Sequence, residues 1–189
     1  MSSASRNRGL TVVGHLSGGT PNRLTEAVMS TAIDTIGEGD AVRFSSGRVM
    51  LATAGTRLVG LFAGYRAVKS DGTPEYGNYY ASGSISGARE LVALITTDPN
   101  LLYEIQSTGA VTTSDINKNA DLAAHSAANA QTKRSTVGLA NSMTTGAAQF
   151  RIVEIFKAAD NEAADSYTRV VVKINEHQFG PTGVEGETA

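Results

Sequence analysis

Apolar and polar residues alternate in short runs along most of this chain, and this pattern predicts antiparallel strands. The clearest example lies at residues 41–44 and 48–52, where two alternating runs flank the turn Ser45-Ser46-Gly47. Two such runs joined by a tight glycine-containing turn indicate a β-hairpin. Further runs of this kind predict strands over residues 58–65, 89–97, 101–106, 135–139, 148–156 and 167–175.

Two segments fit more than one kind of element. The apolar positions of residues 23–36 suit both a helix and a strand, and we favour a strand. Residues 122–130 are rich in alanine and suit a short helix or a loop. The predicted fold is therefore mainly β, sandwich- or barrel-like with hairpins, and it carries an extended N-terminal arm and at most one or two short helices.

The distribution of turn-forming residues predicts how the chain is divided. Residues 1–21 predict an arm, because polar residues and glycines surround a single apolar patch at residues 10–13. Such a patch can add as a strand to a neighbouring subunit, or it can be a frayed terminus. Residues 22–180 predict one β-rich domain, or two lobes at about residues 22–107 and 108–180, and residues 181–189 predict a flexible tail.

The composition points to a polar surface that carries few charges. The chain has 189 residues, of which 18% are charged and 20 are glycine, whereas soluble domains average about 25% charged residues. Uncharged polar groups cost less to desolvate than ions do. The composition therefore fits a surface that contacts other proteins, and it fits equally well a sandwich adapted for solubility.

Charge and cysteine content exclude several classes of function. The net charge is −2, and the longest run of basic residues is the pair Lys133-Arg134, so the clustered phosphate contacts needed for direct nucleic-acid binding are missing. The absence of cysteine excludes disulfides and Cys-zinc sites. No apolar run approaches the roughly 20 residues of a membrane helix, and the first residues lack the apolar centre of a signal peptide. We therefore expect a soluble protein, made in a cytoplasm, without a membrane partner.

The residues that could carry catalysis are scattered. His15, His125 and His177 lie in three different segments, and none is clearly paired with a carboxylate in the sequence. No Gly-x-Ser-x-Gly elbow occurs, so a catalytic triad is not predicted. Glu38 and Asp40 lie in a glycine-rich turn, where Asp commonly bonds its own backbone. The sequence therefore predicts no enzyme and no cofactor.

A metal site is equally weakly indicated. Asp115, Asn117, Asn119 and Asp121 alternate like part of a calcium loop. However, Ala120 stands where that loop needs glycine, and its last ligand is replaced by Ser126. We interpret the segment as a solvated turn and predict no metal.

A cluster of tyrosines follows the turn Asp71-Gly72-Thr73-Pro74. Tyr76, Tyr79 and Tyr80 fall within five residues of one another. Tyrosine combines a large apolar area with a polar tip and is enriched at protein interfaces. The cluster fits an interface or a lid over the core.

Several fragments, taken in order, resemble one family. They are GDAVRF (39–44), VGLFAGYR (59–66), DGTPEYGNYYASG (71–83), TTDPNLLYEIQ (96–106) and VVVKINEHQ (170–178). Together they resemble the small head proteins of tailed bacteriophages that cement or decorate the assembled capsid. The resemblance spans about residues 40–180 and does not include the arm or the tail.

The resemblance implies a β-rich protein of the virion that binds the outer surface of the capsid without catalysis. It implies homotrimers at local three-fold positions, where they bridge neighbouring capsomers of the major capsid protein against internal genome pressure. A carbohydrate-binding or adhesive virion module is the main alternative, with Tyr79 and Tyr80 stacking on sugars; a small hydrolase dependent on His177 or Asp40 is another. Under the capsid hypothesis, the predicted contacts lie in the arm, the tyrosine cluster and the alanine-rich segment. The predicted contact residues are Arg6, Arg8, Leu10, Val12, Val13, Tyr76, Tyr79, Tyr80 and Leu122.

Overall fold

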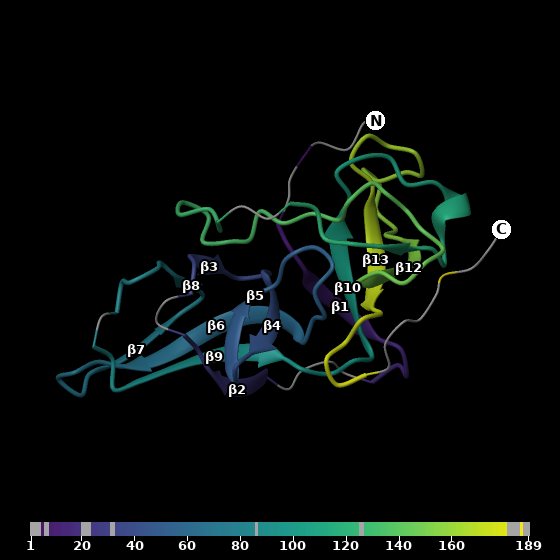
Figure 1. Ribbon diagram of the computed structural model, residues 1–189. Helices are drawn as coiled ribbons and strands as arrows, with labels where there is room; N and C mark the ends of the chain where they lie inside the picture. The colour runs from purple at the N-terminus through teal and green to yellow at the C-terminus, as the bar shows by residue number, and fades with distance from the viewer. Residues whose placement is uncertain are drawn as a thin grey trace.

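The computed structural model describes residues 5, 8–19, 24–30, 33–85, 87–124, 127–180 and 186. It confirms the mainly β prediction: antiparallel sheets dominate, and the described residues contain one helical turn, the 3₁₀ helix η1 (Thr113–Asp115). The strands gather into two lobes that lie side by side (Figure 1). Each lobe has its own cluster of buried apolar side chains, so the molecule has two cores.

The N-terminal lobe is a rolled sheet in which the strands follow the order β2-β9-β6-β4-β5, with β7 paired to the free part of β6. Met29, directly after β2, forms a parallel bridge with Val49 of β5. Because β2 and β5 are the two edge strands of this order, the bridge rolls the sheet on itself. A short ladder of β3 and β8 lies beside it. The strands are β2 (Leu24–Val28), β3 (Ile36–Gly37), β4 (Ala41–Ser45), β5 (Arg48–Leu51), β6 (Gly60–Val68), β7 (Pro74–Gly77), β8 (Tyr79–Tyr80) and β9 (Glu90–Thr96).

The predicted hairpin at residues 41–52 forms as β4 and β5. Ser45 pairs with Arg48, and the two turn residues between them have positive φ, 51° at Ser46 and 73° at Gly47. Such a turn matches the right-handed twist of the two strands, which explains why a short glycine-containing sequence is sufficient here. Val42 and Val49 then point into the core of the lobe.

The C-terminal lobe is a five-stranded sheet in the order β1-β10-β13-β12-β11. Tyr103, Val172 and Ile152 are opposite one another on its three central strands and are fully buried. Most alternate positions are polar, for example Lys173 opposite Arg151, although Leu102 and Val171 also lie there. The strands are β1 (Thr11–His15), β10 (Leu101–Gln106), β11 (Asn119–Ala120), β12 (Phe150–Ile155) and β13 (Arg169–Ile174).

Three expectations about chain organisation need correction. The apolar patch of the predicted arm is folded as β1, which pairs with β10 of its own chain. Residues 101–106 belong to the C-terminal lobe, so the boundary between lobes falls before them. Residues 135–139 form no strand; they lie in a loop that single bridges such as Leu122 to Leu139 connect to its neighbours. Of the two alternatives for residues 122–130, the described part forms a loop. Most of the predicted tail, residues 181–189, lies outside the described residues.

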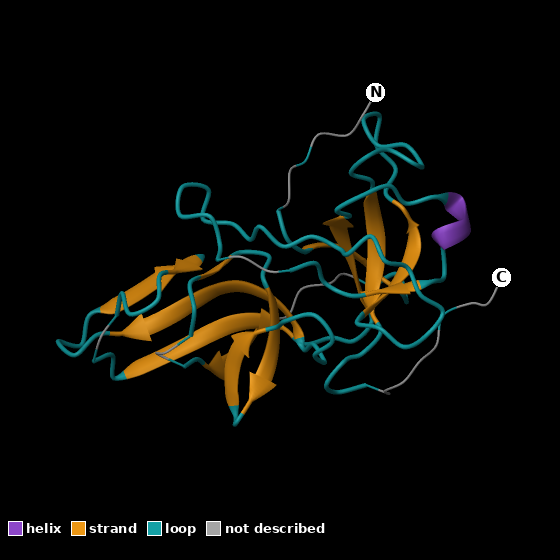
Figure 2. Ribbon diagram, turned by 45° about the horizontal axis from the view of Figure 1, so that its top comes forward, coloured by secondary structure: helices purple, strands orange, loops and turns teal. Residues whose placement is uncertain are grey.

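The two lobes are joined by segments that cross from one to the other, visible as loops between the two groups of strands in Figure 2. The C-terminal clamp (residues 175–180) pairs with the chain before β6, where Leu58 donates to the Glu176 carbonyl and accepts from the Gln178 N–H. The Gln178 amide also bonds both backbone groups of Phe44, at 2.6 and 3.0 Å, as a paired strand would. Because these bonds join β4 and the chain before β6 to the segment that follows β13, they hold the two sheets together.

Candidate functional site: the outer face of the N-terminal sheet

One face of the N-terminal sheet packs on the core, and the opposite face, here called the outer face, is open. The register places Arg66 of β6 opposite Tyr76 of β7 and Val92 of β9, and Val92 opposite Val28 of β2. Directly opposed residues point to the same side of a sheet. Tyr76 is 68% exposed and Val28 52% exposed, so this side carries large apolar groups in contact with solvent.

The charged side chains on the outer face form one cluster of an arginine and two glutamates, with a net charge of −1. Both terminal nitrogens of Arg66 donate to the Glu90 carboxylate, at 3.0 and 2.8 Å, and one also donates to Glu26 at 3.1 Å. These hydrogen bonds raise the pKa of Arg66, and those to Glu90 contribute most. The guanidinium therefore stays charged. A cation that is already bound by two carboxylates loses less on desolvation than a free one does. The outer face can therefore be covered by a partner at lower cost.

The outer face ends at a cleft between the lobes with a volume of about 510 Å³. Leu24, at the start of β2, is 44% exposed and belongs to both the outer face and the cleft. Thr96 lines the cleft, and its buried hydroxyl is 3.0 Å from the Tyr103 hydroxyl of the C-terminal lobe. Burial raises the pKa of Tyr103 to about 12, so it remains neutral. The cleft lining thus combines apolar groups and threonine hydroxyls with three charged residues, Glu38, Asp98 and Arg134.

The structure separates the three clustered tyrosines. Tyr76 is exposed on the outer face, whereas Tyr80 is fully buried and packs edge-on against Tyr65 with ring centroids 5.7 Å apart. Tyr79 is half-buried, and the Lys133 ammonium lies 4.3 Å from its ring centroid. The cluster is therefore partly a surface and partly a core lid, and Tyr80 is not available to a partner in this conformation.

The other predicted contact residues are also divided. Leu10 and Leu122 are each 2% exposed and belong to the core of the C-terminal lobe, so they do not form an open surface. Arg8 is exposed, Val12 is half-buried and Val13 is 41% exposed at an irregularity of β1. Arg6 lies outside the described residues.

Sequence reasoning missed the most open part of the surface. Leu24, Val28 and the ion cluster around Arg66 were not singled out, although Arg66 is an isolated charge in the apolar strand Gly60–Val68. A single charge in such a strand indicates one solvent-facing side. The pairing of β2 with β9 decides which residues lie beside Arg66 on that side. The ambiguous pattern of residues 23–36 did not reveal this pairing.

His177 and Asp40, the residues of the hydrolase alternative, have structural roles. The buried His177 ring contacts the Val59 carbonyl through Nε2 at 2.8 Å and accepts the Phe179 N–H at Nδ1. Burial lowers the pKa of His177 and keeps it neutral. The buried Asp40 carboxylate accepts the Gly37 N–H at 2.8 Å, in agreement with the predicted turn.

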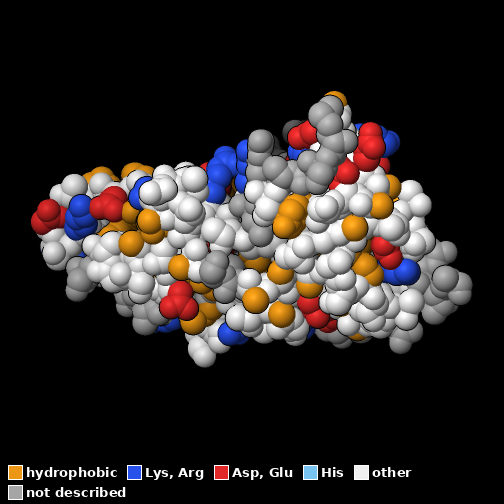
Figure 3. Space-filling model, turned by 90° about the horizontal axis from the view of Figure 1, so that it is seen from above, with side chains coloured by type: hydrophobic (Ala, Val, Ile, Leu, Met, Phe, Trp, Pro, Cys, Tyr) orange, Lys and Arg blue, Asp and Glu red, His pale blue; other side chains and the backbone are white. Residues whose placement is uncertain are grey.

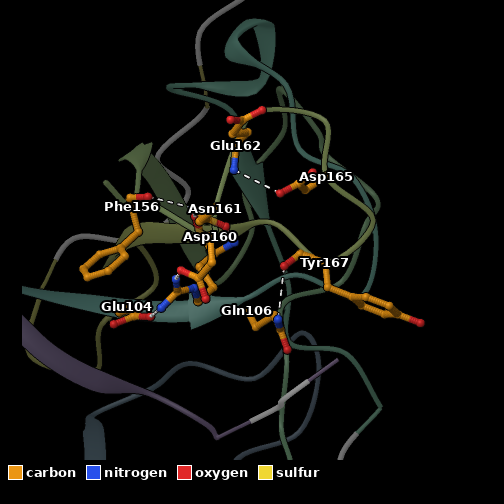
Figure 4. Close-up of polar contacts among 9 residues, drawn as sticks. Glu104, Gln106, Phe156, Asp160, Asn161, Glu162, Asp165 and Tyr167 are labelled. Atoms are coloured by element: carbon orange, nitrogen blue, oxygen red, sulfur yellow. Dashed lines mark hydrogen bonds and ion pairs between the residues drawn. The ribbon is translucent and has the colours of Figure 1, made fainter. Parts of the chain in front are cut away.

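Acidic residues in the loop between β12 and β13 lie near one another but are individually engaged (Figure 4). Arg169 binds both Asp160 and Glu104, and Asp165 accepts the Glu162 N–H at 3.0 Å. Asn161 bonds the Phe156 and Arg169 carbonyls and organises the loop. No group of three potential metal ligands occurs among the residues that the structure describes.

The residues of the supposed calcium loop also bind elsewhere. Asp115 accepts from Thr112 and Lys118, and Asp121 accepts the Gln149 N–H at 3.0 Å. The Asn119 amide donates to the Gly146 carbonyl. These side chains hold different loops, which is why their alternation in the sequence does not create a common oxygen cage.

Basic residues are distributed over the molecule. On the face shown in Figure 3, Lys and Arg side chains stand in small separate groups within an uncharged polar surface. Among the described segments, no helix has the length and hydropathy needed to cross a bilayer. No family model matches the chain, and comparisons with curated proteins and with solved structures gave no significant match.

Proposed function

We propose that this chain is a bacteriophage virion structural protein that binds the outer surface of the capsid as a homotrimer at local three-fold positions and cements neighbouring capsomers. The partner is the major capsid protein, the place is the virion, and cementing itself requires no catalysis. The family resemblance of residues 40–180 suggests this function. The observation that carries it is the outer face, a sheet surface with exposed Tyr76, Val28 and Leu24 around an ion cluster whose charged groups are hydrogen-bonded to one another.

The physical argument rests on the cost of covering this surface. Exposed apolar groups gain roughly 25 cal/mol for each Å² removed from water. Contiguous apolar groups on a soluble domain commonly mark a site of protein contact. The Arg66 cluster retains its hydrogen bonds when a partner covers it, which reduces the cost of its desolvation.

The connection between the lobes supports a reinforcing role. A cement must transmit load between two capsomers, which requires that its own parts do not separate. Gln178 and Leu58 connect the two sheets through backbone-type hydrogen bonds. Many subunits that each bridge one joint would then resist rupture together.

Co-sedimentation with DNA-free expanded heads tests the capsid contact. Tyr76→Ser and Val28→Ser should each weaken binding by about tenfold, because loss of one well-packed apolar contact costs on the order of 1–2 kcal/mol. Leu16→Ser is the matched control: Leu16 is 50% exposed, as Val28 is at 52%, but it lies beyond β1 and off the outer face. Equal binding by all three variants and the unchanged protein would exclude the outer face as the contact.

Light scattering tests the trimer separately. The 19.6 kDa chain should elute with about three times that mass. A strict monomer at all concentrations would contradict the trimer in solution. Virions heated with and without the protein should then differ in rupture temperature; equal temperatures would contradict cementing.

The carbohydrate alternative loses part of its basis. It relied on stacking by Tyr79 and Tyr80, but Tyr80 is buried and the Tyr79 ring is faced by Lys133. Tyr76 is then the one exposed ring of the three. A glycan array with Tyr76→Ser as the control would reveal this activity if it exists.

A further inference from the structure

The turn after β1 contains a serine, a histidine and a carboxylate joined in series. The Ser17 hydroxyl is 2.7 Å from Nδ1 of His15, and Nε2 of His15 is 3.0 Å from Oδ2 of Asp98. Ser17 and His15 come from the end of β1, whereas Asp98 comes from the connection between β9 and β10. Pairing of β1 with β10, including His15 opposite Leu101, brings them together.

The hydrogen bonds define which nitrogen of His15 carries the proton. The Ser17 backbone N–H donates to Nδ1 at 3.1 Å, so Nδ1 presents its lone pair. The proton of the neutral ring therefore lies on Nε2 and is donated to Asp98. Asp98 is held on its other oxygen by the Asn100 N–H at 2.8 Å. That bond, and then the contact with His15, lower the pKa of Asp98, so the carboxylate is ionised at neutral pH.

This arrangement has the connectivity of a nucleophile, a base and an orienting acid. In the common Ser-His-Asp triad, Nε2 faces the serine and Nδ1 faces the carboxylate, whereas here the two nitrogens are exchanged. The proton still moves from the serine to the histidine. Nδ1 can accept the proton of Ser17, and Asp98 stabilises the imidazolium that results. The side chain of His15 is 15% exposed, so water competes little for the base.

The nucleophile is accessible. Ser17 is exposed in the run Ser17-Gly18-Gly19, and a Cβ added at Gly18 would have no atom within 4 Å. Asp98 also lines the inter-lobe cleft of about 510 Å³, together with apolar groups such as Leu24 and Leu101. Ser17 and His15 lie outside the cleft lining, and Asp98 connects the cleft to them. An acyl chain that enters the cleft beside Asp98 can extend over apolar groups while its carbonyl end points toward the turn.

We propose that Ser17 is an activated nucleophile that accepts acyl groups from esters of apolar acids, with His15 as its base and Asp98 as the residue that orients it. The Ser17 oxygen forms a bond to the ester carbonyl carbon, its proton moves to Nδ1 of His15, and the bond to the leaving alcohol breaks as the alcohol takes that proton. Water then attacks the acyl-serine, gives its proton to Nδ1 and releases the acid, and Ser17 recovers its proton. This activity is independent of capsid binding.

The full chain, treated with a fluorophosphonate probe and with p-nitrophenyl butyrate, provides the test. The probe forms an oxygen–phosphorus bond at Ser17 and releases fluoride, which mass spectrometry of the Ser17 peptide detects. Because a positioned base contributes about 10²–10⁴-fold, His15→Gln should slow labelling by about 100-fold, and Asp98→Asn by at least about tenfold. Ser17→Ala should abolish the adduct. Ser70→Ala, at another exposed turn serine, should leave it unchanged.

Unfolding curves establish that each variant is folded. If His15→Gln does not fold, the labelling rate of Asp98→Asn provides the second measurement. Labelling at Ser17 that depends on both His15 and Asp98 supports the proposal. An unlabelled Ser17 in the folded protein, adducts at other serines alone, or equal labelling rates with and without His15 would overturn it and leave these contacts as an ordinary turn.

Discussion

The two sheets of this molecule have similar inner faces but different outer faces. In the C-terminal lobe, buried Tyr103, Val172 and Ile152 alternate with polar groups such as Lys173 and Arg151. In the N-terminal lobe, the outer face instead keeps Tyr76 and Val28 exposed. A sheet that meets water on one side normally alternates apolar and polar residues. The departure from that rule in one lobe is the basis on which we propose this surface as the partner contact.

The largest expected effect comes from the inner faces. Both cores should contribute equally to the free energy of unfolding. Phe62 in the N-terminal core and Phe150 in the C-terminal core are both fully buried. Phe62→Ala and Phe150→Ala should each lower the free energy of unfolding by about 3–5 kcal/mol, the usual cost of a large cavity. Denaturant unfolding followed by fluorescence and circular dichroism should give one transition for both variants, because the clamp joins the lobes. Two separate transitions would mean that the lobes are independent.

The second test concerns the junction of the lobes. The buried Gln149 amide accepts the Leu122 N–H and donates to the Thr53 and Thr56 carbonyls, at 2.8, 2.8 and 2.6 Å. Gln149→Ala removes the partner of the Leu122 N–H and of the Thr56 carbonyl, whereas the Thr53 carbonyl still accepts from Thr56. The variant should therefore cost about 3 kcal/mol, since each unsatisfied buried group costs roughly 1–3 kcal/mol. The exposed Gln131→Ala is the control and should change stability by less than about 0.5 kcal/mol. Similar melting curves for the two variants would refute the role of Gln149.

How far the sequence predicts this architecture depends on what holds each segment. The strands at 41–45 and 101–106 were predictable, because alternation and turn residues are local signals. The course of residues 107–149 was not, since Gln149 and Asn119 order it by bonding backbone groups far away in the chain. The same limit applied to Ser17, His15 and Asp98, which a strand pairing brings together. The contact between His15 and Asp98 could be recognised only once the pairing of β1 with β10 was known.

The third test uses pH to probe the clamp. Burial lowers the pKa of His177 in the folded protein below the ordinary value of about 6.5 that it has when unfolded. Below that value the unfolded chain binds a proton more readily, so stability should fall as the pH drops from about 6.5 through the folded pKa. His177→Asn should remove this part of the pH dependence, which urea titrations at pH 4.5–7.5 can measure. An unchanged slope in the variant would assign the dependence to other groups.

The smallest expected effect on the isolated chain is also the most informative about the outer face. Val28→Thr and Tyr76→Ser replace side chains that are already more than half exposed, so each should change the free energy of unfolding by less than about 0.5 kcal/mol. Val172→Thr, on the buried inner face of the other sheet, should cost clearly more because it buries a hydroxyl. Thermal melts at low protein concentration make the comparison. If Val28→Thr destabilised the isolated chain as much as Val172→Thr, then Val28 would be serving the fold itself, and its exposure would no longer require a partner as the explanation.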